Sequence, residues 1–264
     1  MKTKKDTTPY FPPRKDGELW EYFHENSKNS EFKAFAPPES IQEEMHKVKT
    51  IKTIDEQDKF HLPTPMIKAG QDVLTTILHR SSKTTFGKAN ISLKQLSTLL
   101  YYTYGERPTV ASQEFPSPRM VPSASRNYPL ELFFYHHEGI EGLKSGIWKY
   151  HPKGHFLSLC KSNVSKEELS VGLFQPDLID AAPVVFFITS LFFYMTTKYR
   201  DRGYRFTLLE AGHLAQNLNL VATALNFTTL NIGGYHDNVI DEILDLDGLF
   251  QSTIYLTLLG MKNN

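Results

Sequence analysis

The chain has 264 residues, a length that suits one large domain or one domain with an extension. Hydrophobic residues make up 40% of it, which is enough for a substantial core and argues against wholesale disorder. Because 29 basic and 29 acidic residues balance, net charge gives no reason to expect nucleic acid or a membrane surface as a partner. The single cysteine, Cys160, excludes an internal disulfide framework and a cysteine-based zinc site, and it fits a reducing, cytoplasmic location.

Charge is concentrated near the N-terminus, where residues 1–60 carry 11 Lys/Arg and 12 Asp/Glu. This pattern predicts a solvated, mostly helical extension over residues 1–60, joined through a proline-containing hinge to a main domain over residues 61–264. The most apolar run, residues 181–195, is shorter than the ~20 residues of a membrane helix and contains Pro183. We therefore expect a buried strand that runs into a helix there, and no membrane span.

Periodicity predicts the first elements of the main domain. Apolar residues at helical spacing indicate helices over residues 67–79 and 92–104, the second with Ser92 as its N-cap. A long loop rich in proline and serine follows over residues 105–122, and loops of this length are usually functional or disordered. Strand-like runs then cover residues 130–136, 146–151, 155–161 and 184–189, of which the second and third are expected to form a hairpin.

The C-terminal third begins with a long helix, predicted over residues 204–225. It is apolar on nearly every side, so we expect it to be buried all round, in a core or a subunit interface. A strand over residues 228–232, a helix over 239–244 and a strand over 253–259 complete the chain. Helices and strands alternate without a regular βαβ repeat, which predicts the α+β class.

Several common catalytic patterns are missing from the sequence. It has no G-x-G-x-x-G, no Walker A motif, no H-E-x-x-H and no G-x-S-x-G, so these give no support to a dinucleotide-binding, P-loop, zinc-protease or serine-hydrolase site. Ten histidines invite a metal interpretation, but His151 and His155 fall across a predicted turn and no carboxylate or cysteine completes a ligand set. We predict no metal site.

Three short segments suit a flavin with a phosphate. Residues 79–83 (HRSSK) combine cations and hydroxyl groups that can bind a phosphate, although basic residues are also ordinary at a helix C-terminus. Residues 122–126 (PSASR) form the second segment. The third, Gly233-Gly234, permits the close backbone approach that a flat aromatic ring requires, and its N–H groups could reach the flavin N5 edge. Taken alone, each of the last two segments is also compatible with an ordinary turn.

In this order the three segments resemble the nitroreductase superfamily, whose members are dimers that bind FMN at the subunit interface. Residues 198–206 (KYRDRGYRF) and 208–217 (LLEAGHLAQN) look like segments of the SagB/McbC-type azoline dehydrogenases within it. The resemblance covers residues 70–260. It implies a central, mostly antiparallel sheet flanked by helices, a homodimer, and oxidation of peptide thiazolines or oxazolines to azoles.

The resemblance also implies roles for individual residues. FMN phosphate and ribityl contacts are expected from Arg80, Ser81 and Lys83, with His79 at a position where the family usually carries arginine. The flavin contacts expected from the partner subunit are Pro122, Ser123, Ala124, Ser125 (where the family commonly has glycine) and Arg126, and those at the isoalloxazine edge are Gly233 and Gly234.

Lys198 and Tyr199 match the family's Lys-Tyr pair and are the candidates for proton transfer to and from the azoline ring. Both groups normally titrate near ~10, so a base at neutral pH requires a lowered pKa, for which Arg200, Arg202 and Arg205 could supply the field. Because sequence neighbours do not share a helix face, we expect the pair at a helix end or in the loop before Gly203.

Other functions remain open from the sequence. The chain could be an NAD(P)H-dependent nitro or quinone reductase, which needs no substrate base, or a scaffold in a peptide-modifying complex. The expected partners of the azoline dehydrogenase are an azoline-containing precursor peptide and a cyclodehydratase, but residues 1–60 carry no motif that identifies a binding partner.

Overall fold

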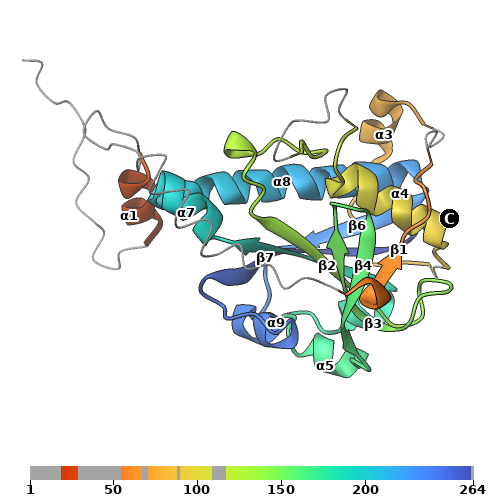
Figure 1. Cartoon of the computed structure of the whole chain (residues 1–264). Coiled ribbons are helices and arrows are strands. Elements are labelled where there is room, and N and C mark those ends of the chain that lie inside the picture. Colours follow the sequence, from red (N-terminus) through yellow and green to blue (C-terminus); the bar gives the residue numbers. More distant parts are fainter. Residues whose placement is uncertain (1–18, 29–54, 67–70, 88–89, 109–116, 263–264) are drawn as a thin grey trace, which may run out of the picture.

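A computed structural model of the chain describes residues 19–28, 55–66, 71–87, 90–108 and 117–262. It contains a seven-stranded sheet with the order β1-β4-β3-β2-β5-β7-β6, in which every neighbouring pair is antiparallel. The helices α3, α4 and α8 lie on one side of this sheet, and α5 and α9 lie on the other (Figure 1). The predicted α+β class with a mostly antiparallel sheet is confirmed.

The strands are β1 (Lys59–His61), β2 (Leu130–His136), β3 (Gly146–His151), β4 (Phe156–Ser162), β5 (Val184–Leu191), β6 (Phe227–Ile232) and β7 (Gln251–Met261). The α-helices are α1 (Leu19–Asn26), α3 (Val73–His79), α4 (Leu93–Tyr104), α5 (Lys166–Ser170), α6 (Asp177–Ala181), α7 (Phe193–Tyr199), α8 (Asp201–Ala224) and α9 (Asp237–Ile243). Short 3-10 turns cover Glu56–Asp58 (η1) and Ala124–Arg126 (η2).

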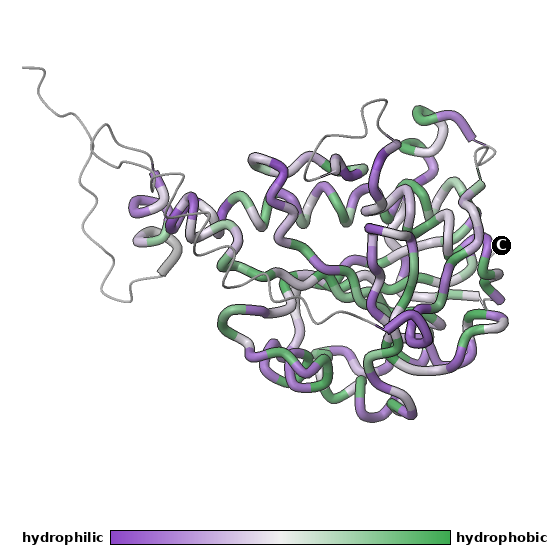
Figure 2. Tube along the Cα trace, viewed as in Figure 1, coloured by the Kyte–Doolittle hydropathy of each residue, from purple (hydrophilic) through white to green (hydrophobic). Residues whose placement is uncertain are grey.

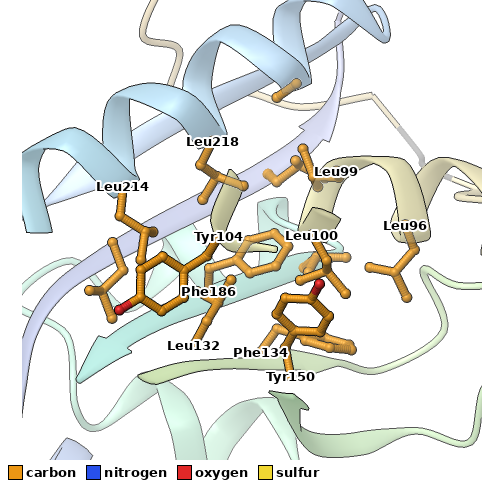
Figure 3. Packing of buried hydrophobic residues seen from close by; sticks show 14 of the residues in the cluster. Leu96, Leu99, Leu100, Tyr104, Leu132, Phe134, Tyr150, Phe186, Leu214 and Leu218 are labelled. Carbon is orange, nitrogen blue, oxygen red and sulfur yellow. The ribbon is translucent and has the colours of Figure 1, made fainter. Parts of the chain in front are cut away.

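The central strands are apolar on both faces because both faces are covered. Side chains alternate along β2, so Phe134 packs under α4 and α8 while Phe133 and Tyr135 pack on the opposite face with α5 and α9. Phe134 also lies beside Phe186 of the neighbouring strand, with ring centroids 5.7 Å apart. Figure 3 shows the α4–α8 side of this core, and Figure 2 shows the apolar residues concentrated in the sheet between the helices.

Local signals placed several elements correctly. Ser92 caps α4, and Gln95 completes a capping box there, as the predicted helix start requires. Strands β3 and β4 form the predicted hairpin, with Gly154 at φ 84° in its turn. The described part of the first predicted helix begins at Val73, behind the N-cap Asp72, and residues 67–70 lie outside the described residues.

The long helix α8 is amphipathic within one chain, which differs from the predicted burial on every side. Leu214, Leu218 and Ala222 are fully buried against the sheet and α4. On the other side, Leu208 and Leu209 are 41% and 57% exposed. Among the residues that the structure describes, the helix therefore has an uncovered apolar face, which leaves the subunit interface as the second alternative.

The described part of the N-terminal region contacts the main body at two places. Strand β1 pairs with β4, so the expected boundary at residue 60 falls inside a strand of the sheet, and the division into two parts stays a prediction. Helix α1 lies against the start of α8, where the Arg202 guanidinium donates to the Ser27 carbonyl at 2.9 Å and Arg205 donates to the Ser27 hydroxyl. No helix in the described part of the chain is long and apolar enough to cross a membrane.

Candidate functional site

The segment that follows α3 lies along the first half of edge strand β6. Helix α3 ends at His79, and Arg80 is its C-cap. Ser82 then forms a parallel bridge with Thr229, and the Lys83 N–H donates to the Thr229 carbonyl at 3.2 Å. These bonds fix the backbone of the predicted phosphate segment, while the side chains of His79 and Lys83 are exposed and those of Arg80 and Ser81 are half-buried.

A cation that the sequence did not single out lies beside this segment. A small cavity of 30 Å³ is lined by His79, Ser81 and Thr228 together with Lys262, the first residue after β7. Antiparallel pairing places the end of β7 beside the start of β6, which explains how a residue about 180 positions away reaches the segment. In the sequence, Lys262 gave no signal beyond being a basic residue that follows a strand.

Residues 122–126 form a tight turn on the α8 side of the molecule. Ser125 and Arg126 have φ of 52° and 55°, in the left-handed region that side chains other than glycine rarely adopt. At position 125, where the resembling family commonly has glycine, serine adopts a backbone conformation that glycine reaches without steric cost. The substitution therefore leaves the turn in a glycine-like shape.

The Lys198-Tyr199 pair ends helix α7, as the sequence reasoning required. Arg200, with φ 51°, separates α7 from α8. The corner is close-packed, because a Cβ on Gly203 would lie 2.4 Å from the Met195 carbonyl oxygen. The Tyr199 hydroxyl forms a hydrogen bond with the Ser125 hydroxyl, and Lys198 Nζ lies 5.4 Å from the Tyr199 ring centroid. Two of the predicted segments, 122–126 and 198–199, thus meet.

Two of the three arginines expected to surround this pair have another role. Arg202 and Arg205 turn toward helix α1, where they bind the carbonyl of Ser27, its hydroxyl, and the His24 carbonyl. Cations commonly bind the free carbonyl groups at a helix C-terminus. These guanidinium groups therefore fasten α1 to α8, which the sequence pattern could not reveal.

Gly233 and Gly234 follow β6 at the end opposite to Arg80 and Lys83. A Cβ on Gly234 would lie 3.2 Å from the Phe174 ring, whereas one on Gly233 would find only the Tyr255 ring, at 3.9 Å. Packing among the described residues thus accounts for Gly234 but not for Gly233. Gly233 lines an open cavity of 620 Å³, together with Thr196 of α7 and with Tyr204 and Leu208 of α8. The aromatic side chains of the cavity wall are Phe192, Phe193, Tyr235 and Phe250.

The predicted residues therefore gather in two groups within one chain. The first lies along β6, with cations and hydroxyls at its start and the glycines about 13 Å further on, at ~3.3 Å per residue over four residues. The second joins Ser125 to Tyr199. Helix α7 links them, since its Thr196 lines the cavity of Gly233 and its Tyr199 contacts Ser125. In the described part of the chain, no group of three or more His, Cys, Asp or Glu side chains could hold a metal ion.

The profile of the nitroreductase family matches residues 77–261, which is most of the chain and includes every predicted site residue. The chain belongs to the nitroreductase family. Members of this family are oxidoreductases that generally bind FMN.

Three curated proteins are similar to this nitroreductase-family chain. The nitroreductase-family protein MJ1384 of Methanocaldococcus jannaschii is 32% identical over 67% of this chain and 84% of its own length. The microcin B17-processing protein McbC of Escherichia coli is 27% identical over 67% of this chain and 65% of its own length. The trifolitoxin operon protein TfxC of Rhizobium leguminosarum is 24% identical over 66% of this chain and 52% of its own length.

Solved structures of the family share the fold. A nitroreductase-family protein from Anabaena variabilis has a TM-score of 0.72 at 26% identity, with 97% of this chain and 49% of that chain covered. A chain of the E. coli microcin synthetase McbBCD complex with bound truncated pro-microcin has a TM-score of 0.60 at 19% identity, covering 93% and 92%. A Desulfovibrio desulfuricans protein in complex with FMN has a TM-score of 0.50 at 15% identity, covering 74% and 88%.

Proposed function

We propose that this nitroreductase-family protein is an FMN-dependent dehydrogenase that oxidises peptide thiazolines or oxazolines to azoles. The observation that carries the proposal is the contact between Tyr199 and Ser125, which joins the Lys-Tyr pair to the predicted flavin-contacting turn. Similarity to McbC and TfxC, a microcin-processing protein and a trifolitoxin operon protein, supports the same assignment.

The residues present fit FMN. Arg80, Lys83 and Lys262 offer cations near the start of β6, and Ser81 adds a hydroxyl, which is the donor set that a phosphate requires. At the other end of β6, the open space in front of Gly233 would accept the edge of a flat ring, because among the described residues the nearest side chain, the Tyr255 ring, lies at ordinary contact distance, 3.9 Å from where a Cβ would be. An elongated ligand with a phosphate at one end and a ring at the other matches this arrangement.

Proton transfer is the part of the reaction that this chain's own side chains would perform. When bound, FMN supplies the acceptor for the hydride of the azoline ring. Tyr199 and Lys198 end a helix next to the turn at Ser125, so both could reach a ring held there and remove the proton next to its carbonyl group. The Ser125 hydroxyl holds the Tyr199 hydroxyl in one orientation, which favours transfer at a defined atom.

A second copy of the chain is the proposed partner that completes the site. Helix α3 exposes Val73, Leu74, Ile77 and Leu78, each at least 52% exposed, and α8 adds Leu208 and Leu209. Exposed apolar surface of this kind commonly marks an interface. We expect a homodimer in sedimentation experiments, and Leu74→Asp together with Leu78→Asp should produce monomers that lose FMN. Monomers that retain stoichiometric FMN would contradict the shared site.

Cofactor binding gives a direct test of the phosphate segment. Purified protein reconstituted with FMN should be yellow, and Arg80→Ala should weaken FMN binding by ten- to hundredfold, because the phosphate loses a charge-assisted partner. Absorbance and fluorescence titration would measure the affinity. Lys153→Ala, which removes an exposed cation from the β3–β4 turn, serves as the control and should bind FMN normally. A wild-type protein that cannot be reconstituted with FMN would contradict the proposal.

The choice of substrate is tested by comparing two reductants of the flavin. The FMN-loaded protein should be reduced by an azoline-bearing peptide, with loss of two hydrogen atoms per ring detected by mass spectrometry. NAD(P)H should reduce it slowly. Rapid reduction by NAD(P)H and no reaction with azoline peptides would instead identify a nitro or quinone reductase.

A further inference from the structure

A buried carboxyl group lies beneath the turn that carries Ser125. Glu210, on the buried face of α8, is only 2% exposed. Its Oε1 accepts a hydrogen bond at 3.0 Å from the hydroxyl of Tyr104, the last residue of α4, which is also buried. Its Oε2 is buried and has no hydrogen-bond partner among the described residues. Buried carboxyl groups are costly, so this one needs an explanation.

The residues around the Glu210 carboxyl lie in the segment that precedes β2. The Arg119 guanidinium lies over the rings of both Tyr104 and Tyr128, at 4.4 and 4.8 Å from their centroids, and the Arg119 backbone N–H donates to the Tyr128 hydroxyl at 2.9 Å. The Ser123 hydroxyl accepts from the Tyr128 N–H at 3.0 Å and lies next to the Glu210 carboxyl. Glu210 and Tyr104 thus form the buried surface on which the segment 119–128 packs.

The backbone of this segment is strained. Ser125, Arg126 and Tyr128 all have positive φ, between 47° and 55°, a backbone conformation that side chains other than glycine rarely adopt. Strained residues of this kind persist only where the surrounding structure holds them in place. The contacts through Ser123, Tyr128 and Arg119 supply that support, and all three converge on Glu210 and Tyr104.

We propose that Glu210 is a positioning residue: with Tyr104, it holds the segment 119–128 in the strained shape that brings Ser125 against Tyr199. Its importance for catalysis rests on the function proposed above, whereas its effect on the segment does not. Glu210 acts on Tyr199 through the turn that carries Ser125.

Hydrogen exchange of the full-length protein tests the structural half of the proposal without flavin or substrate. Glu210→Ala and Tyr104→Phe should raise exchange by about tenfold in peptides covering residues 119–128, because each removes the buried hydrogen bond. Glu210→Gln should restore most of the protection, since its amide oxygen can still accept from Tyr104. Tyr135→Phe, which removes a buried hydroxyl on the opposite face of the sheet, is the matched control.

Exchange within twofold of wild type in segment 119–128 of Glu210→Ala would overturn the proposal. If Glu210→Ala raises exchange throughout the chain, the Tyr104→Phe variant decides. An increase in exchange confined to residues 119–128 of Tyr104→Phe supports the proposal. An increase in exchange that matches the one in Tyr135→Phe refutes it.

The pH dependence of this protection gives a second signature. Burial raises the pKa of the Glu210 carboxyl to about 7, while the nearby Ser123 and Tyr104 hydroxyls and the Arg119 charge act in the opposite direction. Because the buried form binds its proton more tightly than an exposed glutamate, opening of the segment should become easier as pH rises from 4.5 through 7. After correction for intrinsic exchange, Glu210→Gln should lack this trend. A trend that persists unchanged in Glu210→Gln would contradict the role of Glu210.

A double-mutant cycle tests the catalytic half. Glu210→Ala should lower kcat for azoline oxidation by about 10–100-fold with little change in KM or FMN content, as expected for a misplaced reacting group. In a Tyr199→Phe background the same change should cost less than twofold, because the residue acts through Tyr199. Full additivity would refute this route. If the wild type oxidises no azoline, the proposed function fails while the exchange result still decides the role of Glu210.

Discussion

Tyr199→Phe should slow azole formation by ~10²–10⁴-fold while the protein keeps its FMN and its oligomeric state. The change removes one hydroxyl, which is hydrogen-bonded to Ser125, and leaves the ring on its edge-to-face contact with Phe206. Lys198→Ala should produce a loss in the same range. The rate is measured by mass spectrometry on an azoline-bearing peptide under single-turnover conditions, so that product release does not mask the chemical step.

The control is a tyrosine that lies outside the site. Tyr22 on α1 is 51% exposed, and Tyr22→Phe should leave the rate unchanged. If the Lys-Tyr pair were only a solvated helix end, both site variants would behave like this control, since such positions tolerate substitution within ~0.5 kcal/mol. Full activity of both flavin-loaded variants would remove the pair from the mechanism.

Acid should destabilise the fold through His136. This residue in β2 is completely buried, and burial lowers its pKa to about 4, although its Nε2 hydrogen-bonds the Lys144 carbonyl. The pKa of His136 in the folded protein lies below the unfolded value near 6.5. The contribution of the neutral imidazole to folding stability is therefore fully present above pH 6.5 and is lost as pH falls toward 4. A shift of this size corresponds to about 3 kcal/mol. Burial likewise lowers the pKa of His151 and of His155 to about 4.

Urea denaturation between pH 7 and pH 4 measures this loss. Glu210 acts in the opposite direction over much of the same range, because its raised pKa favours the folded state as it gains a proton. The comparison of variants therefore isolates the histidine: His136→Gln should flatten the decline by about 3 kcal/mol, whereas His213→Gln, on the exposed side of α8, should not. An unchanged slope in His136→Gln would contradict the assignment.

The elements that sequence predicted well are those whose signals are local. The capping box of Ser92 and Gln95 and the turn at Gly154 are each encoded within a few residues. Strand β1 was missed because it has only three residues and exists through its pairing with β4, about a hundred positions away. Helices α5 and α6 have five residues each, too few for a helical period to be visible.

In the candidate site, too, local signals were predictable from sequence and tertiary contacts were not. The motifs named the residues, but nothing local indicated that Ser125 and Tyr199 would meet across 74 positions, or that Arg202 and Arg205 would bind α1. Lys262 and Glu210 were missed for a related reason. Only the fold shows that each has a functional neighbour. Lys262 lines the small cavity beside Ser81, and Glu210 accepts a hydrogen bond from the buried Tyr104 hydroxyl.

The close-packed corner between α7 and α8 bears on how this protein could be engineered. Any side chain at position 203 would collide with the Met195 backbone and displace the end of α7, and with it Tyr199. Arg200, by contrast, has a positive φ that glycine would adopt at no steric cost, so glycine is the replacement that this neighbouring position favours. A library aimed at new peptide substrates should keep Gly203 fixed and randomise the cavity wall instead. Transplanting this α7 into a relative would succeed only if the relative also carries a glycine at this corner.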